Sequence, residues 1–509
     1  MCAGKENTSS PLVKWSVPVA NVVNLMPHPD VWQGISVEAA YPAKYLPEQI
    51  LESGRRIILD FGETLTGRVR LRLESLKAPD SPVRLKLLAA ELPYEAYHDP
   101  DTYTSGLGRG WFQEELITAY ELPEDIELPR RYSLRYLVID IVACPRHSGL
   151  KITRAEVIAQ SSVGEKLPAP LPGWDRQFAA IDNVCSRTLR NCMQEFPEDG
   201  PKRDRRLWLG DLRLQALVNH VTFQRYDIFE KGIRLLYDCK DERGMIPGAV
   251  MMSPAPHASS FVLDYSLLSG RLLLEHCQFS GNLKIGDELF DDTAHQLDFF
   301  RSGFDSKGNY HLPPGWIFID HIKGFDRFTP YICTAIWAAE AVAELAELLN
   351  KPDKVASSLR DEVNSWRQML RNTMLDRESG FLRSGRSGQL SWANQIWGVL
   401  ANVLTPEEGR DVLSRLDKTG NILKPNSPYL MHYFLESCCS CGLNDLLADT
   451  IRRYWGGMIR HGADTFWEIY NEDTPLYTPY GNGDDPRNNS ACHAWSGTPG
   501  WFLRTLFNN

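Results

Sequence analysis

The spacing of hydrophobic residues changes character about one third of the way along the chain. Up to about residue 165, apolar and polar residues alternate in short runs, of which 83–90 (VRLKLLAA) and 136–142 (YLVIDIV) are the clearest. Residues 56–61, 67–73 and 150–153 show similar runs, with Pro, Gly, Asp and Ser between them. Regular short strands separated by turn residues favour an antiparallel β-sandwich.

Beyond this region, hydrophobic residues recur at helical spacing. A proline-rich segment, 164–174, lies between the two halves and is typical of a semi-rigid linker. The predicted helices are 175–195, 211–225, 262–278, 286–301, 328–349, 353–375, 391–403, 406–417, 428–441, 443–455 and 490–507. Their lengths suit paired helices, and the sequence shows no fixed-period repeat of the solenoid kind. The pattern therefore predicts a β-sandwich over 1–165 and a closed (α/α)6 barrel over 166–509.

Composition narrows the class of protein. Hydrophobic content of 43% and charged content of 24% describe a soluble globular protein. A net charge of −10 argues against nucleic acid or an anionic membrane as a partner. No apolar run approaches the ~18 residues that span a bilayer, and the first ten residues lack the apolar core of a signal peptide. The simplest interpretation is a cytoplasmic protein.

The eleven cysteines fit that compartment as free thiols, and their odd number excludes complete internal pairing. Cys438, Cys439 and Cys441 lie close to His432, but their spacing matches no zinc pattern. We expect them to be buried structural thiols on an apolar helix face. Neither a metal site nor a cofactor is predicted.

The most informative segment is the loop 199–211 (DGPKRDRRLWLGD), which combines three carboxylates with four cations and a tryptophan. Carboxylates for acid/base work, an arginine to orient hydroxyls and an aromatic face are the parts of a sugar-cleaving site. Simpler interpretations stay open. Asp211 could cap the following helix, Asp199 could be a turn residue, and Asp204 could form a surface ion pair.

Two further regions carry the same kinds of residue. The long loop 303–326 contains Trp316, Asp320 and His321, all of which could bind a sugar. Alternatively, Trp316 could be a core aromatic residue, and Asp320 and His321 could form hydrogen bonds with the local backbone. Loops of this length are uncommon in compact domains without a functional reason. Trp392, at the start of a predicted helix, could face the same site.

The segment that starts at Thr465 offers an opposing carboxylate. Glu468 lies beside Trp467, where partial burial could adjust its acidity, while Glu472 is typical of a solvated acidic turn. Both glutamates are candidates for a base. His493 could donate to a sugar hydroxyl or be a satisfied histidine at a helix start.

These segments make the chain resemble glycoside hydrolase family 78, the α-L-rhamnosidases. The loop 199–211 resembles the family signature D-x-P-x-R-[DE]-…-W-x-G-D. Residues 465–468 (TFWE) and 489–493 (NSACH) resemble its pair of C-terminal motifs, and 60–70 (DFGETLTGRVR) and 131–139 (RYSLRYLVI) resemble parts of its β-sandwich domain.

The resemblance implies a β-domain before an (α/α)6 barrel, in agreement with the hydrophobic pattern, and hydrolysis of terminal α-L-rhamnosides with inversion and without a metal. It implies that Asp204, where most relatives have glutamate, is the general acid and that Glu468 is the general base. It also implies a sugar site lined by Asp199, Arg203, Trp208, Asp211, Trp316 and His493. From the loops we add Asp320, Trp392 and Trp467 as candidates for binding substrate. Room for a single β-domain suggests small soluble glycosides or oligosaccharides as substrates.

Three alternatives stay open. The same barrel hosts glycosidases and lyases for other sugars, and a uronic or unsaturated residue would be favoured if Lys202, Arg203 or Arg205 pointed at a carboxylate pocket. The aspartate at 204 also permits a sugar-binding protein that has lost catalysis. A structural helical scaffold would leave the clustered carboxylates and tryptophans unexplained. A homodimer is compatible with the sequence but is not required by it.

Overall fold

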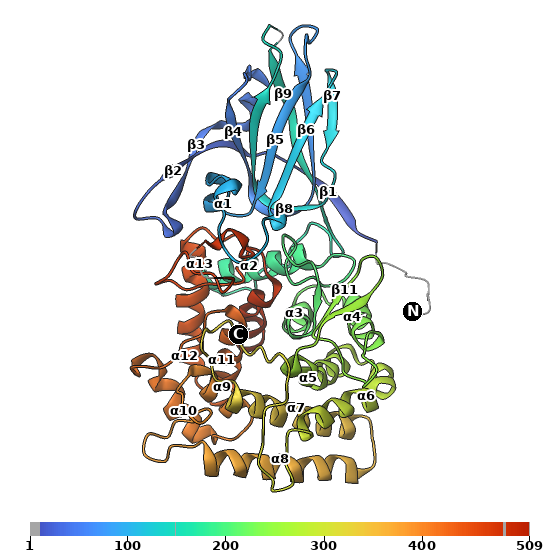
Figure 1. Ribbon diagram of the computed structural model, residues 1–509, viewed down its shortest axis with the longest axis vertical. Coiled ribbons are helices and arrows are strands. Elements are labelled where there is room, and N and C mark those ends of the chain that lie inside the picture. The colour runs from blue at the N-terminus through green and yellow to red at the C-terminus, as the bar shows by residue number, and fades with distance from the viewer. Residues whose placement is uncertain (1–10, 148, 482–484, 508–509) are drawn as a thin grey trace.

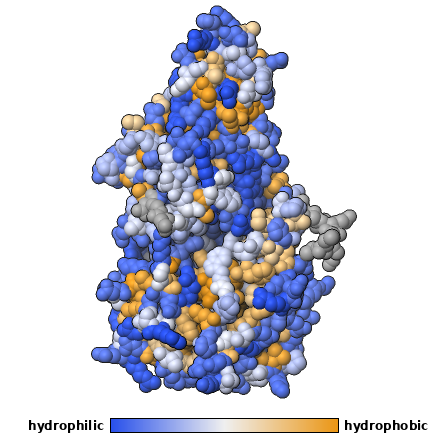
Figure 2. Space-filling model, viewed as in Figure 1, coloured by the Kyte–Doolittle hydropathy of each residue, from blue (hydrophilic) through white to orange (hydrophobic). Residues whose placement is uncertain are grey.

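Strands form the first third of the molecule and helices form the rest, in an elongated shape with the strands at one end (Figure 1). The computed structural model describes residues 11–147, 149–481 and 485–507. Hydrophilic residues cover most of the face seen in Figure 2, with apolar residues in scattered patches on both parts.

The strands of the first part all pair antiparallel. They are β1 (Val13–Pro18), β2 (Asn21–Pro27), β3 (Ile35–Pro42), β4 (Arg56–Ser75), β5 (Val83–Ala90), β6 (Gln113–Ala119), β7 (Glu124–Glu127), β8 (Tyr132–Ala143) and β9 (Leu150–Ser161). The run at 83–90 is β5, as predicted, whereas the separate runs at 56–61 and 67–73 form one long strand, β4. We call residues 13–161 the β-domain.

Strand β4 shapes this domain because it changes partners along its length. Its first half pairs with β2 and β8, and its second half pairs with β7 and β9. The register with β8 shifts between Asp60 and Leu65, and pairing passes from β8 to β9 at Gly67. Leu59, Val69 and Leu71 on β4 are fully buried in the core of the domain. The predicted antiparallel β-sandwich is confirmed.

The rest of the chain, which we call the helical domain, consists mainly of paired helices. They are α2 (Arg176–Cys192), α3 (Leu209–Val221), α4 (Tyr226–Asp238), α5 (Leu263–Ser280), α6 (Leu283–Arg301), α7 (Phe328–Leu348), α8 (Asp353–Thr373), α9 (Trp392–Leu400), α10 (Pro406–Arg415), α11 (Pro428–Ser440), α12 (Asn444–Thr450), α13 (Gly456–Arg460) and α14 (Pro499–Leu506). The short helix α1 (Pro93–Tyr97) belongs to the β-domain. A small sheet of β10 (Leu207–Trp208), β11 (Ala249–Met251) and β12 (His257–Ser260) lies beside α3.

The helices form two layers that close on themselves. Helices α5, α7 and α9 are buried on nearly every side, as inner helices are, whereas α4, α8 and α10 bury one face and expose the other. Helix α2 packs against both α13 and α14, so the first and last helices of the domain meet. The predicted (α/α)6 barrel is confirmed.

The structure refines the helix predictions in three places. The run at 443–455 is helical from Asn444, but a π-helical turn, Ile451–Trp455, joins α12 to α13 and the helical backbone continues to Arg460. The run at 490–507 contains only a 3-10 turn and the short α14. Helix α4, which was not among the predicted ranges, follows α3 closely and pairs with it.

A buried arginine joins three inner helices. The Arg213 side chain, on α3, lies 2.7 Å from Glu275 of α5 and 2.6 Å from Glu436 of α11. Because charges out of water must be paired, this arrangement holds the three helices in one register. It also fixes the first turn of α3, where Asp211 lies.

Charged contacts join the β-domain to the loops at one end of the barrel. The Lys202 ammonium lies 3.2 Å from Glu95 and 3.5 Å from Glu91, and all three side chains are almost fully buried. Burial raises the pKa of both carboxyls, and the charge of Lys202 opposes that shift. Arg131 of the β-domain forms a two-pronged pair with Glu198, at 2.9 and 2.7 Å. The β-domain thus frames the loop that contains residues 198–202.

Two smaller predictions concern cysteines and membrane segments. Cys438 and Cys441 are buried, as expected, but Cys439 is exposed because the helix turns about 100° per residue and carries it to the outer face. Among the described residues, none of the helices is both long enough and apolar enough to cross a bilayer.

Replacing Lys202 with methionine should destabilise the fold. The change leaves Glu91 and Glu95 buried without their cation, which costs about 3 kcal/mol in comparable buried networks. Urea denaturation followed by tryptophan fluorescence would measure the free energy of unfolding. Lys284→Met is the matched control, because that side chain is 84% exposed and its loss should change stability by less than about 0.5 kcal/mol. Equal stability of the two variants would contradict the stabilising role of the Lys202 pair with Glu91 and Glu95.

Candidate active site

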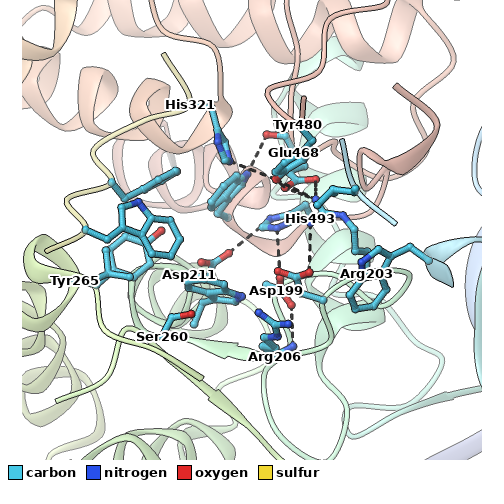
Figure 3. A pocket seen from close by; sticks show the side chains of 18 residues that line it. Asp199, Arg203, Arg206, Asp211, Ser260, Tyr265, His321, Glu468, Tyr480 and His493 are labelled. Atoms are coloured by element: carbon cyan, nitrogen blue, oxygen red, sulfur yellow. Dashed lines mark hydrogen bonds and ion pairs between the residues drawn. The ribbon is translucent and has the colours of Figure 1, made fainter. Parts of the chain in front are cut away.

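A cavity of about 300 Å³ lies among loops of the helical domain and one loop of the β-domain (Figure 3). Most of the residues predicted from the sequence meet there. These are Asp199, Arg203, Asp204, Trp208, Asp211, Trp316, Glu468 and His493. His321, which was a weaker candidate, also lines the cavity.

The loop 199–206 turns back on itself and directs Asp204 toward the cavity. The Asp199 side chain accepts a hydrogen bond from the Arg206 N–H (3.0 Å), which closes the turn. Arg205 adopts a left-handed backbone with φ of 55°, which costs of order 1 kcal/mol for a side chain of this kind. Its guanidinium offsets that cost by donating to the carbonyls of Pro201 (2.8 Å) and Arg131 (3.0 Å).

Asp204 is the most accessible carboxylate of the cavity. Its side chain is 17% exposed, against 5% or less for Asp199, Asp211 and Glu468. Its Oδ1 lies 3.3 Å from Arg203 Nη1, and the residue lines the cavity. A group placed in this way can exchange a proton with a ligand.

Glu468 is held from three directions. The Arg203 guanidinium donates to both of its oxygens, at 2.6 Å for Oε1, and the Tyr480 hydroxyl also donates to Oε1. The Ser490 N–H donates to Oε2 at 2.9 Å. Burial alone would raise the pKa of this carboxyl, but the charge of Arg203 overcomes it and holds the pKa well below its ordinary value. Glu468 is therefore ionised at any physiological pH.

His493 lies between two further carboxylates (Figure 3). Its Nε2 is 3.9 Å from Asp199 and its Nδ1 is 3.6 Å from Asp211. Burial lowers the pKa of His493 to about 3, so the ring is neutral, and burial raises the pKa of both aspartates. His493 Nδ1 and Asp211 Oδ1 form no hydrogen bond but face one another at 3.6 Å. Both side chains line the cavity and are placed to contact a ligand.

Asp211 does not cap α3, contrary to one interpretation of the sequence. The helix begins at Leu209 after Trp208, so Asp211 lies inside its first turn. A carboxylate there is favoured by the helix dipole, and its side chain projects into the cavity.

Aromatic rings form the opposite wall. Trp208 meets Trp316 edge to face, with centroids 5.9 Å apart, and also meets Tyr265 at 6.2 Å. Trp316 is 46% exposed, so it stands at the mouth, whereas Phe318 and Trp495 stack deeper inside. Such a surface suits the apolar face of a sugar ring.

Three predicted binding residues lie outside the cavity. Trp392 packs against Phe434 and lines a separate cavity. Trp467 stacks on Trp32 at 4.5 Å, because neighbouring side chains of an extended segment point in opposite directions and Glu468 takes the inward one. Asp320 holds the start of α11, where it accepts hydrogen bonds from the Asn426 N–H (2.9 Å) and the Ser427 hydroxyl. Burial raises the pKa of Asp320 to about 6.

The structure adds residues that the sequence did not single out. Tyr480 lies in the long loop after Glu468, where an aromatic residue followed by glycine is a weak signal at best. Leu107 and Trp111 come from the β-domain, about 90 residues before the signature loop 199–211, and nothing local points to them. Glu472, the other candidate base, is exposed and lies away from the cavity. In the part of the chain that the structure describes, no group of three or more His, Cys, Asp or Glu side chains is arranged to hold a metal ion.

Comparisons with known families cover both domains. Residues 19–159 match the glycosyl hydrolase family 78 alpha-rhamnosidase N-terminal domain. Residues 174–506 match the bacterial alpha-L-rhamnosidase six-hairpin glycosidase domain. A comparison with curated proteins found no match.

Solved structures agree with these matches. A rhamnosidase from Klebsiella oxytoca, solved with rhamnose bound, is 35% identical, with a TM-score of 0.94 over 98% of this chain and 96% of that one. A family 78 rhamnosidase of Bacillus sp. GL1 is 20% identical, with a TM-score of 0.75 over 92% of this chain and 49% of that one. The α-L-rhamnosidase of Streptomyces avermitilis is 15% identical, with a TM-score of 0.66 over 98% of this chain and 44% of that one. The last two show a shared fold.

The family matches span both domains, and the carboxylates of the signature loop meet Glu468 in one cavity. The chain therefore belongs to glycoside hydrolase family 78, the α-L-rhamnosidases.

Proposed function

We propose that this cavity binds a terminal α-L-rhamnosyl group and that the enzyme hydrolyses it with inversion, with Asp204 as general acid and Glu468 as general base. One observation carries the proposal. The Arg203 guanidinium contacts both carboxylates, so they face one another across the width of a planar group. That arrangement is compatible with the roughly 6.5–9.5 Å between carboxyls that leaves room for a water in inverting glycosidases.

The surroundings of Glu468 suit a base. Arg203 keeps it ionised, and the hydrogen bonds from Tyr480 and Ser490 fix its orientation. A fixed, ionised carboxylate can accept a proton from a water that attacks the anomeric carbon. We assign Arg203 and Tyr480 as positioning residues for this base.

The position of Asp204 suits an acid. Its carboxyl is more accessible than the other carboxylates of the cavity and therefore lies where a leaving group can reach it. Its side chain is one methylene shorter than the glutamate of most relatives, and it still lines the cavity. Asp204 would donate its proton to the glycosidic oxygen as that bond breaks.

The remaining lining suits a 6-deoxy sugar. Asp211 and His493 both line the cavity with polar groups that can bond to ring hydroxyls. Trp208 and Trp316 offer an apolar surface to the methyl group, which needs no polar partner. The rhamnose bound in the Klebsiella oxytoca relative supports this choice of sugar.

A uronic substrate finds no support in the cations that would have favoured it. Lys202 is paired with Glu91 and Glu95, and Arg203 is paired with Glu468. Arg205 donates to backbone carbonyls. The turnover assay described below distinguishes an enzyme from a sugar-binding protein that has lost catalysis.

Four broader predictions remain. We place the domain division near residue 165, because residues 162–175 join β9 to α2 without regular secondary structure. A cytoplasmic location is supported by the free thiols of the described cysteines. A homodimer is supported only by exposed apolar side chains on the β-domain, such as Leu116 on the edge strand β6. We expect small glycosides or oligosaccharides as substrates.

Hydrolysis of p-nitrophenyl α-L-rhamnopyranoside tests the sugar and the base together. The wild type should release p-nitrophenol, and Glu468→Gln should lower kcat/KM about 10³-fold because the water loses its base. Proton NMR of the first turnovers should show β-L-rhamnose, the product of inversion. Glu472→Gln is the matched control and should keep full activity, since that side chain is exposed outside the cavity. Retained activity in Glu468→Gln, or α-L-rhamnose as the first product, would contradict the mechanism.

The acid is tested by changing the leaving group. p-Nitrophenolate is a stable anion and leaves without much help from a proton, whereas methoxide leaves only if the acid protonates it as the bond breaks. Asp204→Asn should therefore lower kcat/KM only about tenfold for p-nitrophenyl α-L-rhamnoside but at least about 10³-fold for methyl α-L-rhamnoside. Asp473→Asn, at an exposed position, should change neither value. Equal losses on the two substrates would sink the assignment of Asp204.

The dependence of kcat/KM on pH tests the role of Arg203. In the wild type the depressed pKa of Glu468 should preserve activity as pH falls below the usual glutamate range, about 4.3. In Arg203→Met, burial acts without the opposing charge of the guanidinium and raises that pKa, so the acid limb should move to higher pH while the maximum falls. Arg243→Met, at a side chain that is 67% exposed, should keep the wild-type profile. An unmoved acid limb in Arg203→Met would rule out electrostatic control of the base.

A further inference from the structure

One loop of the β-domain enters the cavity. It spans residues 103–111, between α1 and β6, and its Leu107 and Trp111 side chains line the space as half-buried residues. Neither side chain has a part in the mechanism above, in which Trp208 and Trp316 already supply the apolar surface for the rhamnosyl ring. They are therefore available to something other than the rhamnosyl ring.

The loop is held firmly against the long loop that follows Glu468. The Gly106 N–H and the Ser105 hydroxyl both donate to the Tyr480 carbonyl, the former at 3.2 Å. A Cβ atom at Gly106 would lie 2.6 Å from Gly481 Cα, so the two loops approach each other at a distance that only glycine allows. Leu107 is thus presented from a preorganised backbone, which reduces the entropy lost on binding.

The same contacts place the loop at the Arg203 end of the cavity, beside the two catalytic carboxylates. The Tyr480 ring packs on the Arg203 guanidinium, 4.5 Å from ring centroid to Cζ, and Arg203 contacts both Asp204 and Glu468. Tyr265, which packs on Trp208 in the aromatic wall, lies on the other side of the cavity from Arg203 (Figure 3). The general acid protonates the glycosidic oxygen, so the leaving group departs toward the side of Asp204.

We propose that Leu107 and Trp111 form the subsite for the leaving group and that it accepts an aromatic aglycone. The inference rests on the proposed function, because the rhamnosyl ring must occupy the carboxylate-lined floor with Asp204 as acid. An aromatic ring can pack on Trp111 and Leu107 without hydroxyls to satisfy. A second sugar would need several polar partners for its hydroxyls, whereas the Leu107 side chain has none and the Trp111 side chain has a single N–H donor. The β-domain would thereby select the substrate as well as frame the site.

The test compares benzyl and methyl α-L-rhamnoside. The two leaving alcohols have similar acidity, so the demand on the general acid is matched and only the aromatic ring differs. The wild type should show a kcat/KM about tenfold higher for the benzyl compound. Leu107→Ala and Trp111→Ala should each remove most of that preference and leave kcat/KM for the methyl compound within about twofold of the wild type. The inhibition constant of free L-rhamnose should not change in either variant.

Thr104→Ala is the control within the same loop, because that side chain is exposed and does not line the cavity, and it should behave as wild type. Two variants are used because either one alone still tests the subsite if the other fails to fold. Equal activity of the wild type on both glycosides would overturn the aromatic subsite alone. Equal losses on both substrates, or weaker inhibition by L-rhamnose, would assign the loop to the rhamnosyl site instead. Absence of turnover on either glycoside would overturn the proposed function, and this inference with it.

Discussion

Two adjacent buried cations hold this active site together. Lys202 turns toward the β-domain and pairs with Glu91 and Glu95, while Arg203 turns toward the cavity and pairs with Glu468. Neither cation can leave its partners without exposing a bare charge to a medium of low polarity. The catalytic loop is therefore tied at consecutive residues to two domains, and the position of Asp204 follows from both ties.

The electrostatics of the cavity arise from an excess of carboxylates over nearby cations. Glu468 receives the guanidinium and stays ionised, whereas Asp199 and Asp211 lie deep without a cation of their own and have raised pKa values. Asp204 keeps the most contact with solvent. Carboxylates of the same chemistry can thus take different roles, because burial and the position of one arginine separate them.

Local patterns allowed much of the fold to be predicted. Strand β5 and helices α7 and α11 match the predicted ranges closely, because their hydrophobic spacing belongs to single regular elements. The signature loop identified Asp199, Arg203 and Asp204, whose spacing has chemical meaning without knowledge of the fold. Prediction failed where a side chain's direction was needed. Trp392 and Trp467 looked suitable as sugar platforms but face other parts of the molecule.

By itself, the sequence determined the class of each domain, the family and the residues able to do acid/base chemistry, because these depend on periodicity and on residue types at short spacing. Tertiary structure decided which of those residues face one cavity, and how their acidity divides. It also brought in Tyr480, Leu107 and Trp111, which are far from the signature loop in sequence. Such convergence depends on long-range packing and on buried charge pairs between distant segments, and neither leaves a trace in local hydrophobic spacing.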